Sequence, residues 1–421
     1  MALCAPHFFA RTTAAQQPPG PVVLGLNVAQ SGPYADEGAD ELRAFELAVQ
    51  HINGEGDGGM LNTMRPLALT GAGILGRRVE FVTGDTQTRS DAARASALTM
   101  IEKDGVSMIS GGSSSGVAVA VQALCQEAGI IFMAGLTHSN DTTGKDRTRN
   151  GFRHFFNSNM SAAALGWGLR FMYGNERRAY YLTADYNWGY NSTATIQAET
   201  EALGWTTVQE VLTPLTQTDF TPYIAPVAAS GADVLVLSHY GGNLVNSITS
   251  AARAGMLGRQ VNGRDFVIAC PLVTDLMLRG IGSDAADLVS TMNWHWSLQD
   301  AGSQAFVRSF GTRYGFPPSS AAHTCYVQTL LYADACQRAG STDACAVVEA
   351  LEDFEFDGLG NGSSLYRAED HQCIKSVPLV KGRPNPENAF DLAQVIDFAP
   401  LSAVAYDPSL LGGSLGDCNS R

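Results

Sequence analysis

The residue pattern with the clearest chemical potential is Gly-x-Ser-x-Gly, which runs from Gly112 to Gly116 within the stretch ISGGSSSGVAVAVQ (109–122). Two kinds of chemistry are compatible with it. Ser114 at its centre could be the nucleophile of a serine hydrolase, presented on a tight turn between a strand and a helix. The same turn could instead use backbone N–H groups and hydroxyls to hold an anion.

The hydrolase interpretation requires a histidine base and an acidic residue that the fold brings to Ser114. Histidines lie downstream at positions 239, 295 and 323, so the order of residues along the chain does not exclude it. The local sequence disfavours it, because a nucleophile elbow presents one serine alone on a strained turn, whereas here three serines follow two glycines. No motif for an oxyanion loop accompanies the pattern.

The anion-binding interpretation fits the surroundings of the pattern better. An apolar stretch at 106–110 predicts a strand before it, and 114–129 predicts a helix after it. Backbone N–H groups in the first turn of a helix lack partners within the helix and lie at the positive end of its dipole, so they attract a carboxylate. The glycines let a ligand approach the main chain, and the hydroxyls of Ser113 and Ser114 add hydrogen bonds. A serine that only caps the helix is the simpler alternative.

The elements that must position this turn follow a strict alternation of strand and helix. In the first part of the chain we expect strands at 22–29, 77–85, 106–110 and 130–135, and helices at 38–53, 90–105 and 114–129. The alternation then restarts, with strands at 178–185, 206–212, 232–240 and 265–270 and helices at 191–204, 219–231 and 243–255. Such alternation predicts parallel sheets covered on both faces, in two α/β units joined near residues 150–160.

Two regions do not continue this alternation. Residues 55–76 hold several glycines and little periodicity, which predicts a surface loop. Past residue 280 we expect helices at 303–315, 319–340 and 344–354, then glycine-rich turns and short strands up to 398. If the tail helices complete the first unit and the last strands complete the second, the chain must cross between the units more than once.

The composition excludes some classes of partner. The chain has 27 Lys and Arg against 41 Asp and Glu, a formal net charge of −14. Nucleic acids and anionic membrane surfaces attract basic proteins, so we expect neither as a partner. No apolar run reaches the ~18 residues that a spanning helix needs. Residues 1–20 are interpreted as a trimmed or mis-started signal segment, with a disordered cytosolic N-terminus as the alternative.

The eight cysteines are too few for a disulfide scaffold and too scattered for a zinc site, because no Cys-x-x-Cys occurs. Cys336 and Cys345 flank a turn between two predicted helices, so we expect this pair to bridge in an oxidising compartment. Cys325 and Cys373 form another conceivable pair, and sequence alone leaves the connectivity open.

Several stretches together resemble one family, the Leu/Ile/Val-binding type of solute-binding protein of ABC importers, also called type I periplasmic binding proteins. LNVAQSGPYADEGADELRAFELAVQHIN (26–53) is similar to the family's first strand, Ser-Gly-Pro turn and first helix. GGSSSGVAVAVQALCQEAGIIFMAG (111–135) looks like its ligand-cradle strand, helix and following strand. TADYNWGYN (183–191) resembles the Asp-Tyr-x-x-Gly turn of its second lobe, and YRAEDHQ (366–372) a late segment of its tail. The resemblance spans residues 21–400 and depends on the order and spacing of these stretches.

The resemblance implies an α/β fold with two Rossmann-like lobes, whose parallel sheets are joined by a multi-strand hinge and close on a small ligand (the type I periplasmic binding fold). The implied division is a residual signal segment at 1–20, lobe 1 at 21–156 plus 293–360, lobe 2 at 157–292 plus 361–400, and a C-terminal tail at 401–421.

The resemblance also carries over part of a ligand site from the first lobe. Ser114, with Ser113 beside it, matches the family's side-chain contact to the ligand carboxylate. The loop AGLTHS (134–139) matches the segment that offers backbone groups and a hydroxyl, which implies that Gly135, Leu136 and Thr137 belong to the site.

Aromatic residues complete the implied site. Trp188 falls where a second-lobe ring covers the ligand, and Tyr240 or its neighbour His239 lies at a strand end where another is expected. Tyr326 matches a late helix aromatic, with an ordinary core position as the alternative. Glu37 stands where some relatives place an aromatic ring, with a helix-capping role as the alternative.

The sequence departs from the family pattern at one position. Amino-acid binders of the family offer an acidic residue to the ligand ammonium from the loop after the strand that matches 265–270. Here that loop reads PLVTD, with Leu272 about where the acid is expected, so Asp275 or Glu37 would have to replace it. Without either, a buried ammonium would lack a counter-charge, which is costly, and the ligand would be a carboxylate without an amine or a neutral amide.

Together these features imply an exported, periplasmic protein that captures a small carboxylate-bearing ligand, such as a branched-chain or other amino acid or a related organic acid. It would pass this ligand to an ABC permease in the inner membrane. We expect no catalysis, no cofactor, no metal, and a monomer or weak dimer. The alternatives are the Ser114 hydrolase and a ligand-sensing regulator with the same fold, of the amide or urea type.

Overall fold

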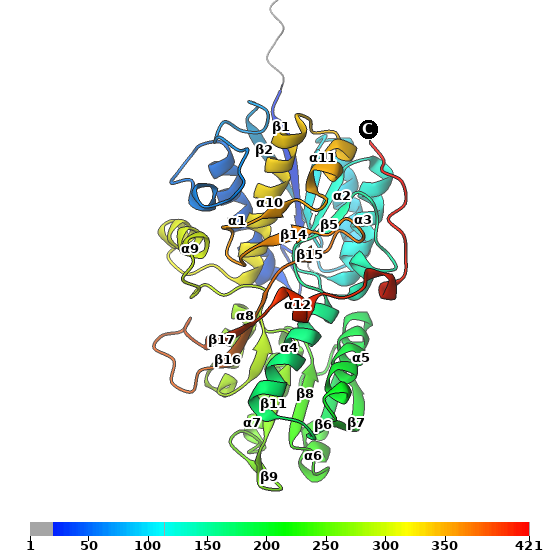
Figure 1. The fold of residues 1–421 in the computed structure, drawn as a ribbon, viewed down its shortest axis with the longest axis vertical. Helices are drawn as coiled ribbons and strands as arrows, with labels where there is room; N and C mark the ends of the chain where they lie inside the picture. Colours follow the sequence, from blue (N-terminus) through cyan, green and yellow to red (C-terminus); the bar gives the residue numbers. More distant parts are fainter. Residues whose placement is uncertain (1–19, 113, 421) are drawn as a thin grey trace, which may run out of the picture.

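Two α/β lobes lie one above the other along the long axis of the molecule in a computed structural model that describes residues 20–112 and 114–420 (Figure 1). The segment 1–19, which holds nearly all of the predicted signal segment, and Ser113 lie outside the described residues. No helix in the described part of the chain combines the length and apolar character that crossing a membrane requires.

The sheet of lobe 1 consists of five parallel strands in the order β2-β1-β3-β4-β5. Its strands are β1 (Val22–Val28), β2 (Val79–Asp85), β3 (Met108–Gly111), β4 (Ile131–Ala134) and β5 (Gly151–Arg153). The lobe's helices are α1 (Ala35–Ile52), α2 (Ser90–Glu102), α3 (Ser115–Ala128), α9 (Ala301–Tyr314), α10 (Ser320–Ala339) and α11 (Ala344–Leu351). Every residue of β3 and β4 is buried, as expected of central parallel strands covered on both faces.

The sheet of lobe 2 has seven strands in the order β17-β16-β12-β11-β8-β6-β7. Its strands are β6 (Arg178–Ala184), β7 (Thr206–Thr213), β8 (Val234–Ser238), β11 (Val267–Cys270), β12 (Val289–Thr291), β16 (Val377–Gly382) and β17 (Ala393–Ala399). The helices are α4 (Ser158–Tyr173), α5 (Asn187–Ala202), α6 (Thr221–Ala229), α7 (Gly242–Arg253) and α8 (Asp275–Ile281). The first five strands along the chain pair in parallel, as predicted, whereas β16 and β17 add antiparallel, so this sheet is mixed.

The insert at 55–76 is not a plain surface loop. It contains a short 3₁₀ helix, η1 (Gly59–Asn62), and Met60, Met64 and Ile74 are fully buried in the hydrophobic core of lobe 1. The prediction was wrong because widely spaced apolar side chains can reach a core without showing a helical or strand period.

Between β1 and β16 the chain passes between the lobes three times, at residues 154–157 after β5, at 292–296 after β12 and at 375–376 before β16. Before the last crossing, β13 (Glu355–Phe356), β14 (Ser364–Tyr366) and β15 (Cys373–Ile374) form a small antiparallel sheet. Because Gln372 bridges to Arg153 beside β5, residues 361–374 lie with lobe 1, where the sequence division had placed them in lobe 2.

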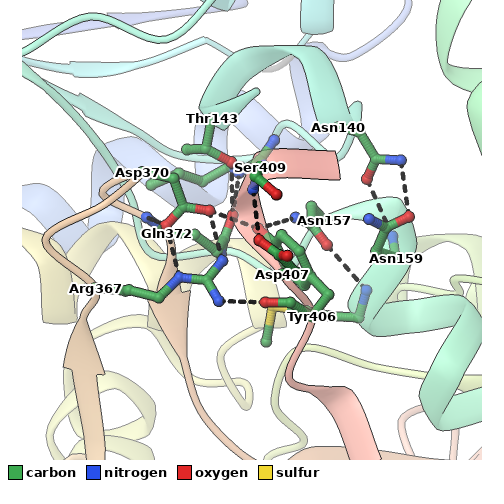
Figure 2. Close-up of polar contacts among 12 residues, drawn as sticks. Asn140, Thr143, Asn157, Asn159, Arg367, Asp370, Gln372, Tyr406, Asp407 and Ser409 are labelled. Carbon is green, nitrogen blue, oxygen red and sulfur yellow. Dashed lines mark hydrogen bonds and ion pairs between the residues drawn. The ribbon is translucent and has the colours of Figure 1, made fainter. Parts of the chain in front are cut away.

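The late segment YRAEDHQ fastens the hinge to the C-terminal tail (Figure 2). Arg367 donates to both carboxylate oxygens of Asp370, at 3.0 and 2.6 Å, and also to the backbone carbonyl of Tyr406 at 2.6 Å. The Tyr406 hydroxyl donates to Asp370 at 2.9 Å and accepts from the Asn157 amide at 2.6 Å. Asn157 also caps the N-terminus of α4, so this network holds the first crossover in place.

Arg153 secures the other side of the same crossover. Its buried guanidinium donates to Gln372 Oε1 at 2.8 Å, to the Ser139 carbonyl at 2.5 Å and to Thr143 Oγ1 at 2.5 Å. Burial lowers the pKa of Arg153 to about 10, and the three acceptors replace the water that the group has lost.

The disulfide joins Cys345 to Cys418, and Cys336 is a free thiol on the buried face of α10. The predicted Cys336–Cys345 pair is therefore wrong. Cys325 and Cys373 are likewise free and buried. The tail past β17 carries α12 (Leu401–Val404) and η4 (Pro408–Leu411), returns to lobe 1, and presents Cys418 to the start of α11 (Figure 1).

Candidate ligand-binding site

The turn between β3 and α3 has a backbone that glycine alone adopts readily. Gly111 and Gly112 have φ values of +137° and +88°, where a side chain would be strained. Ser114 follows as the N-cap residue of α3 with extended backbone angles, and its side chain makes no capping hydrogen bond. The hydroxyl of Ser114 and the first-turn amides of α3 are thus placed to serve a ligand.

A cleft of about 580 Å³ separates the two lobes at this turn. Lobe 1 contributes Tyr34, Arg89 and Ser114 to its walls, among others, and lobe 2 contributes Tyr186, Tyr240 and Asn243. Two residues predicted from the sequence, Ser114 and Tyr240, therefore face the same cleft from opposite lobes. The volume is within the range of small-molecule sites, ~300–1,000 Å³.

The predicted loop after β4 lies next to the α3 turn. The Gly135 amide donates to the Gly111 carbonyl at 2.8 Å, which ties the ends of β3 and β4 together. Thr137 Oγ1 is 3.5 Å from Ser115 Oγ in the first turn of α3. Leu136 and Thr137 are each 1% exposed, and neither is among the residues that line the cleft, so this part of the predicted loop is buried beside the α3 turn.

Aromatic rings from both lobes pack along the cleft. Tyr34 contacts Tyr240 edge to face, with ring centroids 5.4 Å apart. Trp188 lies behind them, 5.9 Å from Tyr240 and 6.0 Å from Tyr186. Sequence reasoning placed Trp188 and Tyr240 here but missed Tyr34 and Tyr186, although both lie inside the stretches that carried the resemblance.

Glu37 connects the lobes beneath these rings. The Tyr240 hydroxyl donates to Glu37 Oε1 at 2.5 Å, while Glu37 Oε2 has no hydrogen-bond partner of good geometry among the described residues. Burial raises the pKa of Glu37 to about 7. Glu37 thus stands within one hydrogen bond of a ring that lines the cleft.

Glu41, one helical turn further along α1, is a second buried acid that sequence reasoning missed. It is fully buried, and neither carboxylate oxygen has a hydrogen-bond partner of good geometry among the described residues. Its Oε1 lies 2.6 Å from the point that a Cβ on Gly135 would occupy, so the acid faces the predicted ligand loop. Burial, and then the charge of Glu37, raise the pKa of Glu41 to about 8.

Glu41→Gln is expected to flatten the pH dependence of thermal stability. Because the folded pKa of about 8 lies above the ordinary value of 4.5, the stabilisation is complete below pH 4.5 and is lost as the pH rises through 8. Unfolding followed by circular dichroism at pH 5, 7 and 9 should show a variant Tm at least ~3 °C above wild type at pH 9 and a smaller difference at pH 5. The exposed substitution Glu127→Gln serves as control, and parallel curves for Glu41→Gln and wild type would contradict the expectation.

Three other predicted residues lie away from the cleft walls. His239 is buried in the lobe 2 core, with hydrogen bonds to Thr213 at 2.9 Å and Ser247 at 3.0 Å. Tyr326 is buried in lobe 1, where its hydroxyl is 2.6 Å from His51 Nδ1.

Asp275 begins α8 and accepts the backbone N–H of Ser320 at 3.1 Å, so it links lobe 2 to the start of α10. Burial raises the pKa of Asp275 to about 7. Leu272, at the position where an acid was expected, is 1% exposed and packs in the lobe 2 core.

Two other kinds of site, a catalytic triad around Ser114 and a metal centre, would need side chains that the described part of the chain does not place there. Within residues 20–112 and 114–420, no histidine is hydrogen-bonded to Ser114, so the Gly-x-Ser-x-Gly pattern is not part of a triad there. The same described ranges contain no group of three His, Cys, Asp or Glu side chains arranged to hold a metal ion.

Comparison with known proteins shows which protein family and which solved structures share this architecture. Residues 21–386 match the family model described as periplasmic binding protein. The Leu/Ile/Val-binding protein homolog 7 of Brucella abortus is 22% identical over 333 residues, which cover 76% of this chain and 78% of that protein.

Two solved structures share the fold over nearly their whole length. The amino acid ABC transporter substrate-binding protein of Pseudomonas fluorescens Pf-5 superposes with a TM-score of 0.83 at 21% identity, covering 94% of this chain and 100% of its own. A solute-binding protein of an ABC transporter from R. palustris, solved with 4-hydroxybenzoate, gives 0.75 at 20% identity and covers 90% and 97%. The predicted type I periplasmic binding fold is therefore confirmed.

Proposed function

Because the chain belongs to the periplasmic binding protein family, we propose that it is an exported protein that captures a small carboxylate-bearing ligand between its lobes for uptake by an ABC transporter. The family is one of non-catalytic solute-binding proteins, so Ser114 acts as a ligand contact and not as a nucleophile. The disulfide between Cys345 and Cys418 supports export, since such bonds persist in oxidising compartments.

The observation that carries this proposal is the position of the α3 N-terminus in the interlobe cleft. Ser114 has a hydroxyl that does not cap its own helix, and it faces Tyr240 of the other lobe across the cleft. Helix N-termini favour negative charge by ~0.3–1 kcal/mol, up to ~2 kcal/mol where they are partly buried. A carboxylate is also the group that amino acids and 4-hydroxybenzoate, the ligands named for the two similar structures, have in common.

Ligand capture then follows from contacts that exist only when the lobes are together. Tyr240 bonds Glu37 across the cleft, and Asn187 of lobe 2 bonds Ser139 at 3.0 Å and Asp141 at 2.6 Å in lobe 1. A ligand that touches both walls adds to these contacts in the closed form alone, so it shifts the population toward closure. A closed complex is the form that a membrane permease would distinguish from the empty protein.

Ser114→Ala is expected to weaken binding of the carboxylate ligand by about tenfold, which corresponds to loss of one charge-assisted hydrogen bond. A thermal-shift screen over amino acids, aromatic acids, short amides and urea should first identify a stabilising compound, and calorimetry should then measure its Kd with both proteins. Ser409→Ala, in the exposed tail, is the control because Ser409 hydrogen-bonds through its backbone N–H and carbonyl, which the substitution keeps. Unchanged affinity in Ser114→Ala would place the site elsewhere, and stabilisation by none of these compounds would count against the proposed function.

A further inference from the structure

The C-terminal tail connects the lobes once more, after the three crossings that precede β16. It leaves lobe 2 behind β17, where α12 packs against α4 and Val404 is buried in the lobe 2 core. It then crosses at residues 405–407 and places η4 against η2 (Asn140–Thr143) of lobe 1. From there the tail runs over lobe 1 towards α11 (Figure 1). The last strands of lobe 2 are therefore attached to lobe 1 at both of their ends.

This tail crossing has little slack. Residues 405–407 alone link α12 to η4, and even an extended chain spans at most ~3.3–3.6 Å per residue. The middle residue, Tyr406, is itself held at the hinge by hydrogen bonds to Asn157 at 2.6 Å and Asp370 at 2.9 Å. A rotation that moves α12 away from η2 must therefore stretch this short segment or lift η4 off lobe 1.

The end of the tail is fixed to lobe 1. The Asn150 side chain donates to the Asn419 carbonyl at 2.7 Å, and the Asn419 side chain donates to two carbonyls at the end of α3, at 2.9 and 3.0 Å. The disulfide between Cys345 and Cys418 adds a covalent bond to the start of α11. Because the end cannot leave, η4 returns to lobe 1 as an intramolecular event, at high effective concentration.

The part of lobe 1 that η4 contacts is also a part that meets lobe 2. η2 follows the loop 134–139, and Asp141 within it accepts a hydrogen bond from Asn187 of lobe 2 at 2.6 Å. Gly144, next to η2, approaches η4 closely, because a Cβ at this position would lie 2.9 Å from Leu411 Cβ. The tail thus packs tightly behind the segment whose contacts hold the lobes together.

From these contacts we propose that the C-terminal tail is a strap that limits how far the lobes open, with the Cys345–Cys418 disulfide as its anchor on lobe 1. Reduction of the disulfide to two thiols frees the end of the strap, so the lobes reach wider openings. Both cysteines are partly exposed, so a reductant can reach the bond. The proposal concerns the motion of the lobes and holds whatever ligand they bind.

A variant with slack in the strap tests the proposal. A flexible Gly/Ser linker of about ten residues, inserted between Tyr406 and Asp407, adds ~17 Å of mean reach. It keeps the disulfide, the contact of η4 with η2 and the hydrogen bonds of Tyr406. The control carries the same linker after Gly263, in the exposed turn between β9 (Gln260–Val261) and β10 (Arg264–Asp265), away from every crossing.

Small-angle X-ray scattering measures the radius of gyration of each full-length protein, extensively dialysed and without added ligand, before and after reduction with tris(2-carboxyethyl)phosphine. The oxidised slack variant should exceed oxidised wild type by about 1 Å, against ~22 Å for a compact chain of this length. Reduction should raise the radii of wild type and the control by a similar amount. It should leave the slack variant unchanged, because the strap of that variant is already loose.

Equal radii for the oxidised slack variant and oxidised wild type overturn the strap. A wild-type radius that reduction leaves unchanged overturns the disulfide as its anchor, and so does further opening of the slack variant on reduction. Circular dichroism verifies that each protein is folded, and the oxidised comparison decides the matter if reduced wild type unfolds. No ligand enters these measurements, so their failure leaves the proposed function standing.

Discussion

Gly38→Ala is expected to lower the free energy of unfolding by ~3 kcal/mol, the upper end of the usual cost of overpacking. A Cβ at this position would lie 1.8 Å from the carbonyl oxygen of Ala29, which is backbone and cannot rotate away. Helix α1 would have to separate from the end of β1, and it carries Glu37 and Glu41 with it.

Lobe 2 repeats this contact. Gly189 at the start of α5 would place a Cβ 2.0 Å from the carbonyl oxygen of Ala184 at the end of β6, so Gly189→Ala should cost a similar amount. In each lobe, one glycine thus lets the helix that follows the lobe's first strand pack closely against the end of that strand. This close approach explains the glycine of the Asp-Tyr-x-x-Gly turn.

Urea unfolding followed by tryptophan fluorescence measures both effects. The control is Gly311→Ala in α9, where the nearest atom to a new Cβ is 3.9 Å away. That variant should gain ~0.5–1 kcal/mol, because alanine is the better helix former. A midpoint for Gly38→Ala equal to that of wild type would contradict the tight contact between α1 and β1.

Asp370→Asn has the second large expected effect, a loss of ~3–5 kcal/mol in the free energy of unfolding, because it removes one partner of a buried ion pair. The Asp370 side chain is fully buried, and it accepts hydrogen bonds from Arg367, Tyr406 and the Gln372 backbone. An amide can satisfy part of this set but leaves the Arg367 charge uncompensated beside the first crossover (Figure 2).

The same urea experiment tests this prediction. Asp417→Asn is a suitable control, since Asp417 lies in the C-terminal tail and is exposed. Equal urea midpoints for Asp370→Asn and Asp417→Asn would contradict the prediction, because they would mean that the polar contacts in Figure 2 contribute nothing measurable to stability.

The alternation of strands and helices was sufficient to predict the two lobes and the parallel strands of both sheets. It could not predict that β16 and β17 join the lobe 2 sheet antiparallel, because a short apolar strand carries no information about its direction. Residues 361–374 were assigned to the wrong side of the last crossing for the same reason: pairing of Gln372 with Arg153 is a contact between segments far apart in the sequence.

The candidate site shows the same division between local and long-range information. Ser114 could be placed because the strand, the glycine turn and the helix are adjacent in the sequence. Tyr240 and His239 could not be told apart, since neighbours at a strand end point to opposite faces. In the structure Tyr240 lines the cleft, while His239 is hydrogen-bonded to Thr213 and Ser247 inside lobe 2.

Other features depended on contacts that no local pattern reveals. Tyr326 bonds His51 across the α1–α10 contact and is therefore held in the core. Cys345 forms its disulfide with Cys418 because the tail returns to lobe 1. Cys336 lies on the buried face of α10 and packs in the core. Spacing alone favoured the nearer cysteine.

The most direct test of this account is a crystal structure of the protein bound to the tightest ligand from the screen. We predict density between Ser114 and Tyr240, with a carboxylate within hydrogen-bonding distance of Ser114 Oγ and of the first-turn amides of α3. A ligand bound outside the interlobe cleft, or one whose carboxylate turns away from α3, would contradict the account.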